Sequence, residues 1–166
     1  MRNIVLIGMP GVGKSTIGQR LASALGRRFV DTDALMEQQQ GRSLQDIIDR
    51  DGLTTFLSIE EQVVLGLTVS GHVVATGGSV VYSARAMARL KENGMLIYLK
   101  VPYAEIKARI KDESNRGLVM SKEQDLLGLY EERTPLYEAY ADAVIECGGR
   151  DVAEVTRMIT AIAATG

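Results

Sequence analysis

The sequence has few of the residues that build metal centres and covalent cross-links. It contains one cysteine, Cys147, and one histidine, His72, which excludes an internal disulfide and a zinc site made of several such ligands. We interpret both residues as buried packing residues rather than reagents. Tryptophan is absent and proline occurs three times, while 46% of the residues are hydrophobic. This composition excludes a collagen-like or disordered chain and is typical of a globular domain.

Neither sign of charge dominates. The 19 Lys and Arg residues stand against 21 Asp and Glu residues, a net charge of −2, and no stretch gathers five or six like charges. The sequence therefore lacks the basic surface expected of a protein that binds duplex DNA or an anionic membrane. It also lacks an apolar run long enough for a transmembrane helix and a small-residue cleavage site near its start. We expect a cytoplasmic monomer without nucleic-acid or membrane partners.

Strand-like and helix-like segments alternate along the chain, without a linker or an internal repeat. A chain of 166 residues can form one complete core, so we expect a single domain, residues 1–166. We predict strands at residues 3–7, 28–31, 72–76, 95–101 and 143–146. We predict helices at residues 15–25, 34–40, 44–50, 54–69, 84–92, 102–111, 122–141 and 152–163, with a polar stretch at 112–121. Five short strands separated by helices indicate an α/β fold, a parallel sheet with helices on both faces.

A glycine-rich motif follows the first predicted strand. The segment Gly-Met-Pro-Gly-Val-Gly-Lys-Ser at 8–15 fits the phosphate-binding P-loop pattern G-x-x-x-x-G-K-[ST]. Its glycines let backbone N–H groups face a phosphate, Lys14 adds a mobile positive charge, and the hydroxyl of Ser15 can bind Mg²⁺. The motif predicts a nucleoside triphosphate ligand, although a glycine-rich strand-to-helix turn is the simpler alternative. The residues that we predict to bind ATP in this segment are Gly11, Val12, Gly13, Lys14, Ser15 and Thr16.

Two further loops follow predicted strands and so lie at the ligand-binding edge of a parallel sheet. Asp31 and Asp33 close the second strand, and carboxylates two residues apart on an extended chain project to the same side. One can support Mg²⁺ while the other binds a hydroxyl; alternatively, Asp33 only caps the following helix. The pair Gly77 and Gly78 allows close approach of a ligand, or forms a plain turn. No Asn-Lys-x-Asp sequence that would recognise guanine occurs, and the chain is too short for a mechanical domain. We therefore expect a small acceptor.

Together these motifs resemble those of the shikimate kinase family, within the nucleoside-monophosphate-kinase-like group of P-loop folds. The resemblance covers nearly the whole chain. It rests on G-M-P-G-V-G-K-S-T-I-G-x-x-L-A-x-x-L at 8–25, F-V-D-T-D at 29–33, the spacing of Phe56 and Glu60, V-V-A-T-G-G at 73–78 and R-T-P-L-Y at 133–137. The resemblance implies a three-layer fold with strand order 2-3-1-4-5, acceptor-binding helices at about 34–69 and a lid at about 112–121. It also implies transfer of the γ-phosphoryl group of ATP, with Mg²⁺, to a hydroxyl of a small carboxylated metabolite. Shikimate is the first candidate, giving 3-phosphoshikimate in aromatic amino acid biosynthesis.

The resemblance also assigns roles to single residues. Lys14 and Ser15 would hold phosphate and Mg²⁺, Asp31 would reach the metal through water, and Asp33 would bind acceptor hydroxyls and orient or deprotonate the attacking one. Gly77, Gly78 and Ser79 would line the acceptor site. Arg133 would pair with the acceptor carboxylate, Arg116 would close over the transferred phosphoryl group, and Arg109 would stack on adenine. Each arginine could instead be a solvated surface charge.

Two acceptor-site positions depart from the family pattern. Leu57 stands where the family has a second carboxylate-binding arginine, and Ser79 stands where it has a third glycine. The family's lid sequence Arg-Pro-Leu-Leu is Arg-Gly-Leu-Val at 116–119. Losing one member of a charged clamp costs several kcal/mol of binding. The alternatives are therefore a kinase for another small hydroxylated metabolite, such as homoserine or gluconate, and a nucleotide-binding regulatory module. Against a gluconate kinase, Ala34 stands where that family has a histidine.

Overall fold

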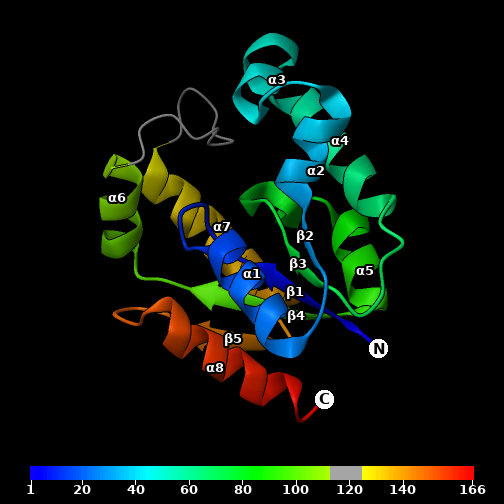
Figure 1. Ribbon diagram of the computed structural model, residues 1–166. Helices are drawn as coiled ribbons and strands as arrows, with labels where there is room; N and C mark the ends of the chain where they lie inside the picture. The colour runs from blue at the N-terminus through cyan, green and yellow to red at the C-terminus, as the bar shows by residue number, and fades with distance from the viewer. Residues whose placement is uncertain (113–124) are drawn as a thin grey trace.

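A parallel sheet forms the centre of the molecule in a computed structural model that describes residues 1–112 and 125–166. Its strand order is β2-β3-β1-β4-β5 (Figure 1), which confirms the predicted sheet and strand order. The strands are β1 (Asn3–Ile7), β2 (Phe29–Asp31), β3 (Val73–Ala75), β4 (Gly94–Lys100) and β5 (Ala143–Glu146). The central strand β1 is buried along its whole length because β3 and β4 flank it and helices cover both of its faces. The four consecutive apolar residues after Asn3 are typical of such a strand.

Helices cover the sheet on two sides. Helices α1 (Lys14–Leu25) and α8 (Val152–Ala163) pack together on the side turned to the viewer in Figure 1. Helices α5 (Ala84–Glu92) and α7 (Leu126–Tyr140) pack against β4 from the other side, and α6 (Tyr103–Asp112) contacts α7. None of the described helices is long and apolar enough to cross a membrane.

Three helices extend beyond the sheet at the end where β2 leads into α2 (Figure 1). They are α2 (Thr32–Gln40), α3 (Leu44–Asp51) and α4 (Leu53–Leu65). They enclose a small hydrophobic core of their own, which consists of Met36, Ile47, Phe56 and Val63. We call it the α2–α4 core. Ser43 caps α3 by accepting a hydrogen bond from the backbone N–H of Asp46. These three helices are therefore stabilised by a core of their own, beside the ligand-binding edge of the sheet.

Several predicted boundaries differ from the structure for local reasons. The predicted helix at 54–69 ends at Leu65, because Gly66 takes the C-cap position and a connection to β3 follows. The 3₁₀ helix η1 (Gly78–Tyr82), which has no periodic pattern to predict it, follows the glycine pair. Residues 113–124 lie outside the described part of the chain. They include most of the predicted lid at 112–121 and the start of the predicted helix at 122–141.

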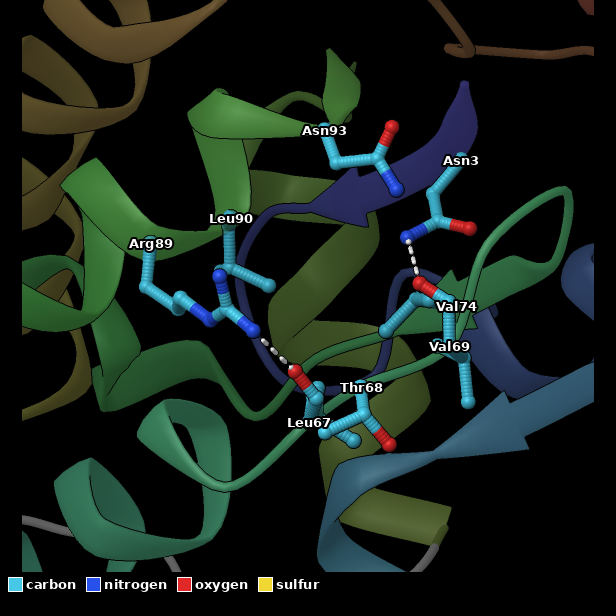
Figure 2. A pocket seen from close by; sticks show the side chains of 8 residues that line it. All are labelled: Asn3, Leu67, Thr68, Val69, Val74, Arg89, Leu90 and Asn93. Atoms are coloured by element: carbon cyan, nitrogen blue, oxygen red, sulfur yellow. Dashed lines mark hydrogen bonds between the residues drawn. The ribbon is translucent and has the colours of Figure 1, made fainter. Parts of the chain in front are cut away.

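The amino-terminal edge of the sheet holds a small cavity of about 80 Å³ (Figure 2). Polar side chains at this cavity hold the loop before β3: the Asn3 amide donates to the carbonyl of Val69 at 2.9 Å, and Arg89 donates to that of Leu67 at 2.7 Å. His72, at the same edge, is only half-buried, which corrects the expectation that it is buried, and its ring hydrogen-bonds to the carbonyl of Ser70. These contacts stabilise the loop and lie at the end of the sheet opposite the glycine-rich motif.

Candidate active site

The glycine-rich motif forms a tight loop between β1 and α1. Gly11 and Gly13 have φ angles of 81° and 92°, in the left-handed region that favours glycine. Gly13 is also the N-cap of α1, so the positive end of the helix dipole faces the loop. Val12 packs into the hydrophobic core, whereas Thr16 is exposed on the first turn of α1. The loop has the geometry of an anion-binding site at a helix N-terminus.

Lys14 folds back over this loop. Its ammonium group donates to the backbone carbonyls of Gly8 at 2.6 Å and Met9 at 2.8 Å, and the residue is only 8% exposed. Burial lowers the pKa of Lys14 to about 8, although the carboxyl groups of Asp33 and Asp31 oppose that shift. At pH 7 Lys14 therefore remains mostly protonated, beside the backbone that would receive phosphate.

Asp31, at the end of β2, links α1 and α2 through hydrogen bonds of its side chain. One of its oxygens accepts hydrogen bonds from the backbone N–H groups of Asp33 (2.9 Å) and Ala34 (3.3 Å), and the other accepts from the hydroxyl of Ser15. Asp31, not Asp33, is thus the N-cap of α2, so the alternative in which Asp33 caps that helix is wrong. Because α2 begins at Thr32, Asp33 lies in the first turn of a helix. The prediction that Asp31 and Asp33 project to the same side of an extended chain was therefore wrong. The cap leaves the Asp33 side chain available to the site.

Asp33 and Glu60 converge on Gly77. A methyl group built on Gly77 would lie 2.5 Å from Oδ1 of Asp33 and 2.7 Å from Oε2 of Glu60, so both oxygens occupy the space above this glycine. Burial, reinforced by the nearby charge of Asp31, raises the pKa of Asp33 to about 6, while Lys14 opposes the shift. Asp33 was predicted from the sequence to line the site, whereas Glu60 was not. The signal for Glu60 was its spacing of four residues from Phe56, which places the two on one face of α4.

Glu60 is a buried acid without a cation in hydrogen-bond contact in the described part of the chain. It is 3% exposed, and its Oε1 accepts a hydrogen bond of 2.7 Å from the hydroxyl of Ser79. Within residues 1–112 and 125–166, nothing hydrogen-bonds to its Oε2. Burial raises the pKa of Glu60 to about 7, opposed by the Ser79 hydrogen bond and by the charges of Arg133 and Lys14.

Arg133 supplies a guanidinium group to the same region. It is 1% exposed, it donates from Nε to the hydroxyl of Tyr82 at 3.1 Å, and it lies 5.1 Å from the centre of the Tyr82 ring. A methyl group built on Gly78 would lie 2.9 Å from Nη1 of Arg133. One turn further along α7, Tyr137 donates to the carbonyl of Gly78 at 2.6 Å. Helix α7 therefore holds both the guanidinium and the glycine pair in place. No site role was predicted from the sequence for Tyr82 or for Tyr137.

These side chains line one pocket at the carboxyl edge of the sheet. Its described lining residues are Pro10, Asp33, Leu44, Phe56, Glu60, Gly77, Gly78, Ser79 and Arg133. Leu57 is not among them, because its side chain packs against the α2–α4 core. Among these lining residues, Arg133 is the one with a positive charge. Arg116 lies outside the described residues.

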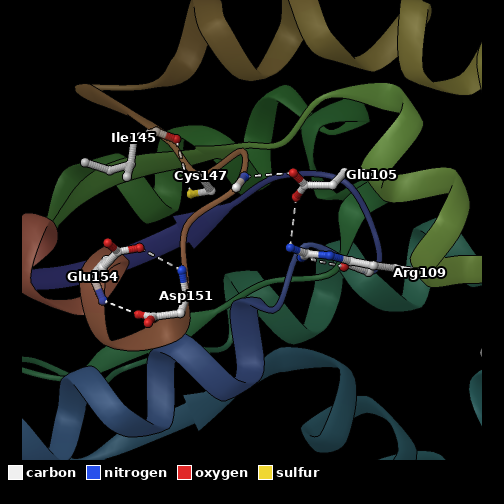
Figure 3. A network of polar contacts seen from close by, with 8 residues as sticks. Glu105, Arg109, Ile145, Cys147, Asp151 and Glu154 are labelled. Carbon is white, nitrogen blue, oxygen red and sulfur yellow. Dashed lines mark hydrogen bonds and ion pairs between the residues drawn. The ribbon is translucent and has the colours of Figure 1, made fainter.

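Arg109 lies on the other side of the glycine-rich loop (Figure 3). It donates to the carbonyl of Gly11 at 3.3 Å and pairs with Glu105 at 3.1 Å, and Glu105 in turn accepts from the backbone N–H of Gly149. This network joins α6, the loop and the connection between β5 and α8. Cys147, nearby, is buried, and burial raises the pKa of its thiol to about 11, which agrees with a packing role.

The described residues contain no group of three or more His, Cys, Asp and Glu side chains that could hold a metal ion. The hydroxyl of Ser15 and the carboxylate of Asp31 are in contact, however, and oxygen atoms are the ligands that Mg²⁺ prefers. A magnesium ion there would need phosphate and water oxygens to complete its coordination.

A glycine-rich phosphate loop at the end of the central strand, beside a pocket with carboxyl groups and a guanidinium, defines a P-loop kinase that acts on a small molecule. The family model of shikimate kinase matches residues 10–163. A shikimate kinase of Paracidovorax citrulli is 40% identical over 163 residues, covering 95% of this chain and 89% of the relative. One of Persephonella marina is 35% identical, covering 96% and 97%. The solved structure of Acinetobacter baumannii shikimate kinase in complex with shikimate superimposes with a TM-score of 0.92 at 32% identity, covering 99% of this chain and 94% of that one. This chain belongs to the shikimate kinase family, whose members use ATP as the phosphate donor.

Proposed function

We propose that this chain transfers the γ-phosphoryl group of ATP to a hydroxyl of shikimate, forming 3-phosphoshikimate, a step of aromatic amino acid biosynthesis. One observation carries the proposal: Arg133 and Asp33 lie against the adjacent residues Gly78 and Gly77 of one pocket. A ring with a carboxylate at one end and hydroxyls at the other complements this arrangement. We also propose that the enzyme is a cytoplasmic monomer, with residues 34–69 contributing to acceptor binding.

In this proposal the glycine-rich loop and Lys14 hold the phosphates of ATP. Lys14 would exchange its contacts with the Gly8 and Met9 carbonyls for phosphate oxygens, which its buried positive charge favours. Arg109, anchored on the carbonyl of Gly11, would lie beside the nucleotide. The contact between Ser15 and Asp31 fits Mg²⁺, with Ser15 binding it directly and Asp31 through water. A bound Mg²⁺ supplies charge neutralisation on the phosphate oxygens.

Asp33 acts on the acceptor. Its carboxylate accepts a hydrogen bond from the attacking hydroxyl and takes its proton as the oxygen bonds to phosphorus and ADP leaves. A pKa of about 6 leaves Asp33 mostly ionised at pH 7 and more basic than an ordinary aspartate. Arg133, held by Tyr82, pairs with the acceptor carboxylate.

A second candidate is a kinase of the same family that acts on another small hydroxylated acid, such as homoserine or gluconate. The observation that favours it is Leu57, since the described pocket has one guanidinium where the family pattern has two. The acceptor carboxylate would then be bound less tightly, and hydroxyl contacts would weigh more in selectivity.

Release of ADP from Mg-ATP, followed with shikimate, homoserine, gluconate and related small alcohols, tests the proposal. We expect efficient turnover of shikimate. Efficient turnover of another acceptor with shikimate inert would establish the second candidate, and no acceptor-dependent turnover by a folded, ATP-binding protein would overturn both. Arg133→Met should abolish discrimination between each acid and its amide, whereas the exposed Arg85→Met on α5 should not.

A further inference from the structure

A series of hydrogen bonds outside the acceptor pocket ends on the glycine-rich loop (Figure 3). The carboxyl group of Glu105 accepts from the backbone N–H of Gly149 at 2.8 Å through Oε1 and from the guanidinium of Arg109 at 3.1 Å through Oε2. Arg109 in turn donates to the carbonyl of Gly11 at 3.3 Å. The proposed function places Arg109 beside the nucleotide but leaves Glu105, which joins the two ends of this series, without a role.

Two glycines bring the connection between β5 and α8 onto α6. A methyl group built on Gly148 would lie 2.9 Å from Cδ of Pro102, the residue before α6, so a side chain there would push the two segments apart. Gly149 has a φ of 69°, in the left-handed region that favours glycine, and its N–H donates to Glu105. This close approach fixes the Glu105 carboxyl group to the backbone that follows β5.

At the other end, the series sets the orientation of one peptide group in the glycine-rich loop. The peptide bond between Gly11 and Val12 is trans, so the C=O of Gly11 and the N–H of Val12 point to opposite sides. Arg109 holds this C=O toward α6, and a methyl group built on Gly11 would lie 3.2 Å from Cγ1 of Ile110 on the same helix. The N–H of Val12 therefore points away from α6. Backbone N–H groups of this motif are donors to phosphate, and a peptide that turned over would present a carbonyl oxygen instead.

We infer that Glu105 is a positioning residue of the nucleotide site, which acts through Arg109 on the glycine-rich loop. By holding Arg109 on the Gly11 carbonyl, it keeps the N–H of the next residue directed at a phosphate of ATP. A carboxylate suits this task because it accepts from Arg109 and from Gly149 at once, and because its bond to a guanidinium is charge-assisted. This inference rests on the proposed kinase function and adds to it a determinant of phosphate binding.

The test is a double-mutant cycle with two ligands. Calorimetry measures the Kd of Mg-ATP and of magnesium-bound inorganic triphosphate for the parent, Glu105→Gln, Arg109→Met and the double variant. The glutamine amide has one acceptor oxygen, so it cannot accept from both Arg109 and Gly149 in the way the carboxylate does. We expect Glu105→Gln to raise the Kd of both ligands by about 3- to 10-fold. Because Glu105 acts through Arg109, the same substitution made in Arg109→Met should change each Kd by less than about 2-fold.

Glu61→Gln is the matched control, because the Glu61 carboxyl group also accepts from two donors, Ser83 and Arg85, but joins α4 to the start of α5. It should leave both Kd values within about 2-fold of the parent. Three results in the folded variants would overturn the inference: no loss of binding in Glu105→Gln, a loss for Mg-ATP without one for inorganic triphosphate, or additive losses in the double variant.

These binding measurements need no acceptor. Failure of the parent to phosphorylate shikimate would therefore refute the proposed function and leave the test of Glu105 intact. If the folded parent bound neither Mg-ATP nor inorganic triphosphate, the proposed function and the inference would both be overturned.

Discussion

Gly77→Ala should impair the acceptor site without unfolding the protein. Gly77 has φ −70° and ψ 154°, a conformation open to any residue, so the backbone does not require glycine. The added methyl group would lie 2.5 Å from Asp33 Oδ1 and 2.7 Å from Glu60 Oε2, well inside van der Waals contact. One or both carboxyl groups must therefore move away from the acceptor.

The magnitude follows from the cost of overpacking. Forcing an extra methyl group into a filled site costs about 1–3 kcal/mol, which corresponds to roughly 5- to 150-fold. We expect kcat/KM for the acceptor to fall by that factor in an ADP-release assay, because the methyl group displaces the group that receives the hydroxyl proton. ATP affinity, measured by calorimetry, should change less than about 2-fold.

Gly66→Ala is the control, because it also adds a methyl group at a negative φ and lies at the end of α4, away from the pocket. It should leave kcat/KM for the acceptor near the parent value. A folded Gly77→Ala enzyme with parental kcat/KM for the acceptor would refute the assignment of Asp33 and Glu60 to the acceptor site.

The remaining predictions concern charge and pH. Lys14→Ala should lower kcat by at least about 100-fold. Asp33→Asn should lose phosphoryl transfer but still bind Mg-ATP, which calorimetry measures. Near-parental turnover by Asp33→Asn would contradict the role of Asp33 as the base. Acid should reduce kcat/KM below pH 6, the pKa of Asp33, because the protonated carboxyl group no longer accepts the hydroxyl proton, and a profile flat to pH 5 would exclude Asp33 as the base. Glu60 binds its proton more tightly in the folded state (pKa about 7) than in the unfolded state (about 4.5), so the unliganded protein should lose up to about 3 kcal/mol of stability as pH rises from 4.5 through 7. Denaturant titrations of the parent and Glu60→Gln at pH 5 and 8 measure this loss, which should be smaller in the variant because only the contribution of Asp33, whose pKa is also raised, remains. Tyr82→Phe keeps the ring beside Arg133 and removes the hydroxyl that accepts the Nε–H of Arg133. The KM for the acceptor should therefore rise about 3- to 10-fold, while the KM for ATP stays unchanged. Equal rises in both KM values would place Tyr82 outside the acceptor site.

Local sequence was sufficient for the individual strands and for the phosphate-binding loop. The buried strand β1 was predicted from the four apolar residues that follow Asn3, and the loop after it from its glycines, Lys14 and Ser15. These features arise from neighbours in the chain: strand burial sets the hydrophobic run, and the turn into α1 sets the glycines. The strand order was accessible through resemblance alone, because pairing between β2 and β3 joins distant segments.

The acceptor site was decided by the tertiary structure. Glu60 meets Ser79 across 19 residues, Asp33 meets Gly77 across 44, and Arg133 meets Tyr82 across 51. No periodicity along the chain encodes such contacts, because each depends on where α2, α4, η1 and α7 pack around the sheet. Asp31 illustrates the same limit at short range, since both aspartates of the Asp-Thr-Asp segment could have capped α2 and only the folded backbone selected Asp31. The sequence by itself therefore determined that the protein binds a nucleotide phosphate at the end of β1. Packing of remote helices against that edge determined which carboxyl groups face the acceptor, because burial and proximity, not residue type, set their pKa values and their partners.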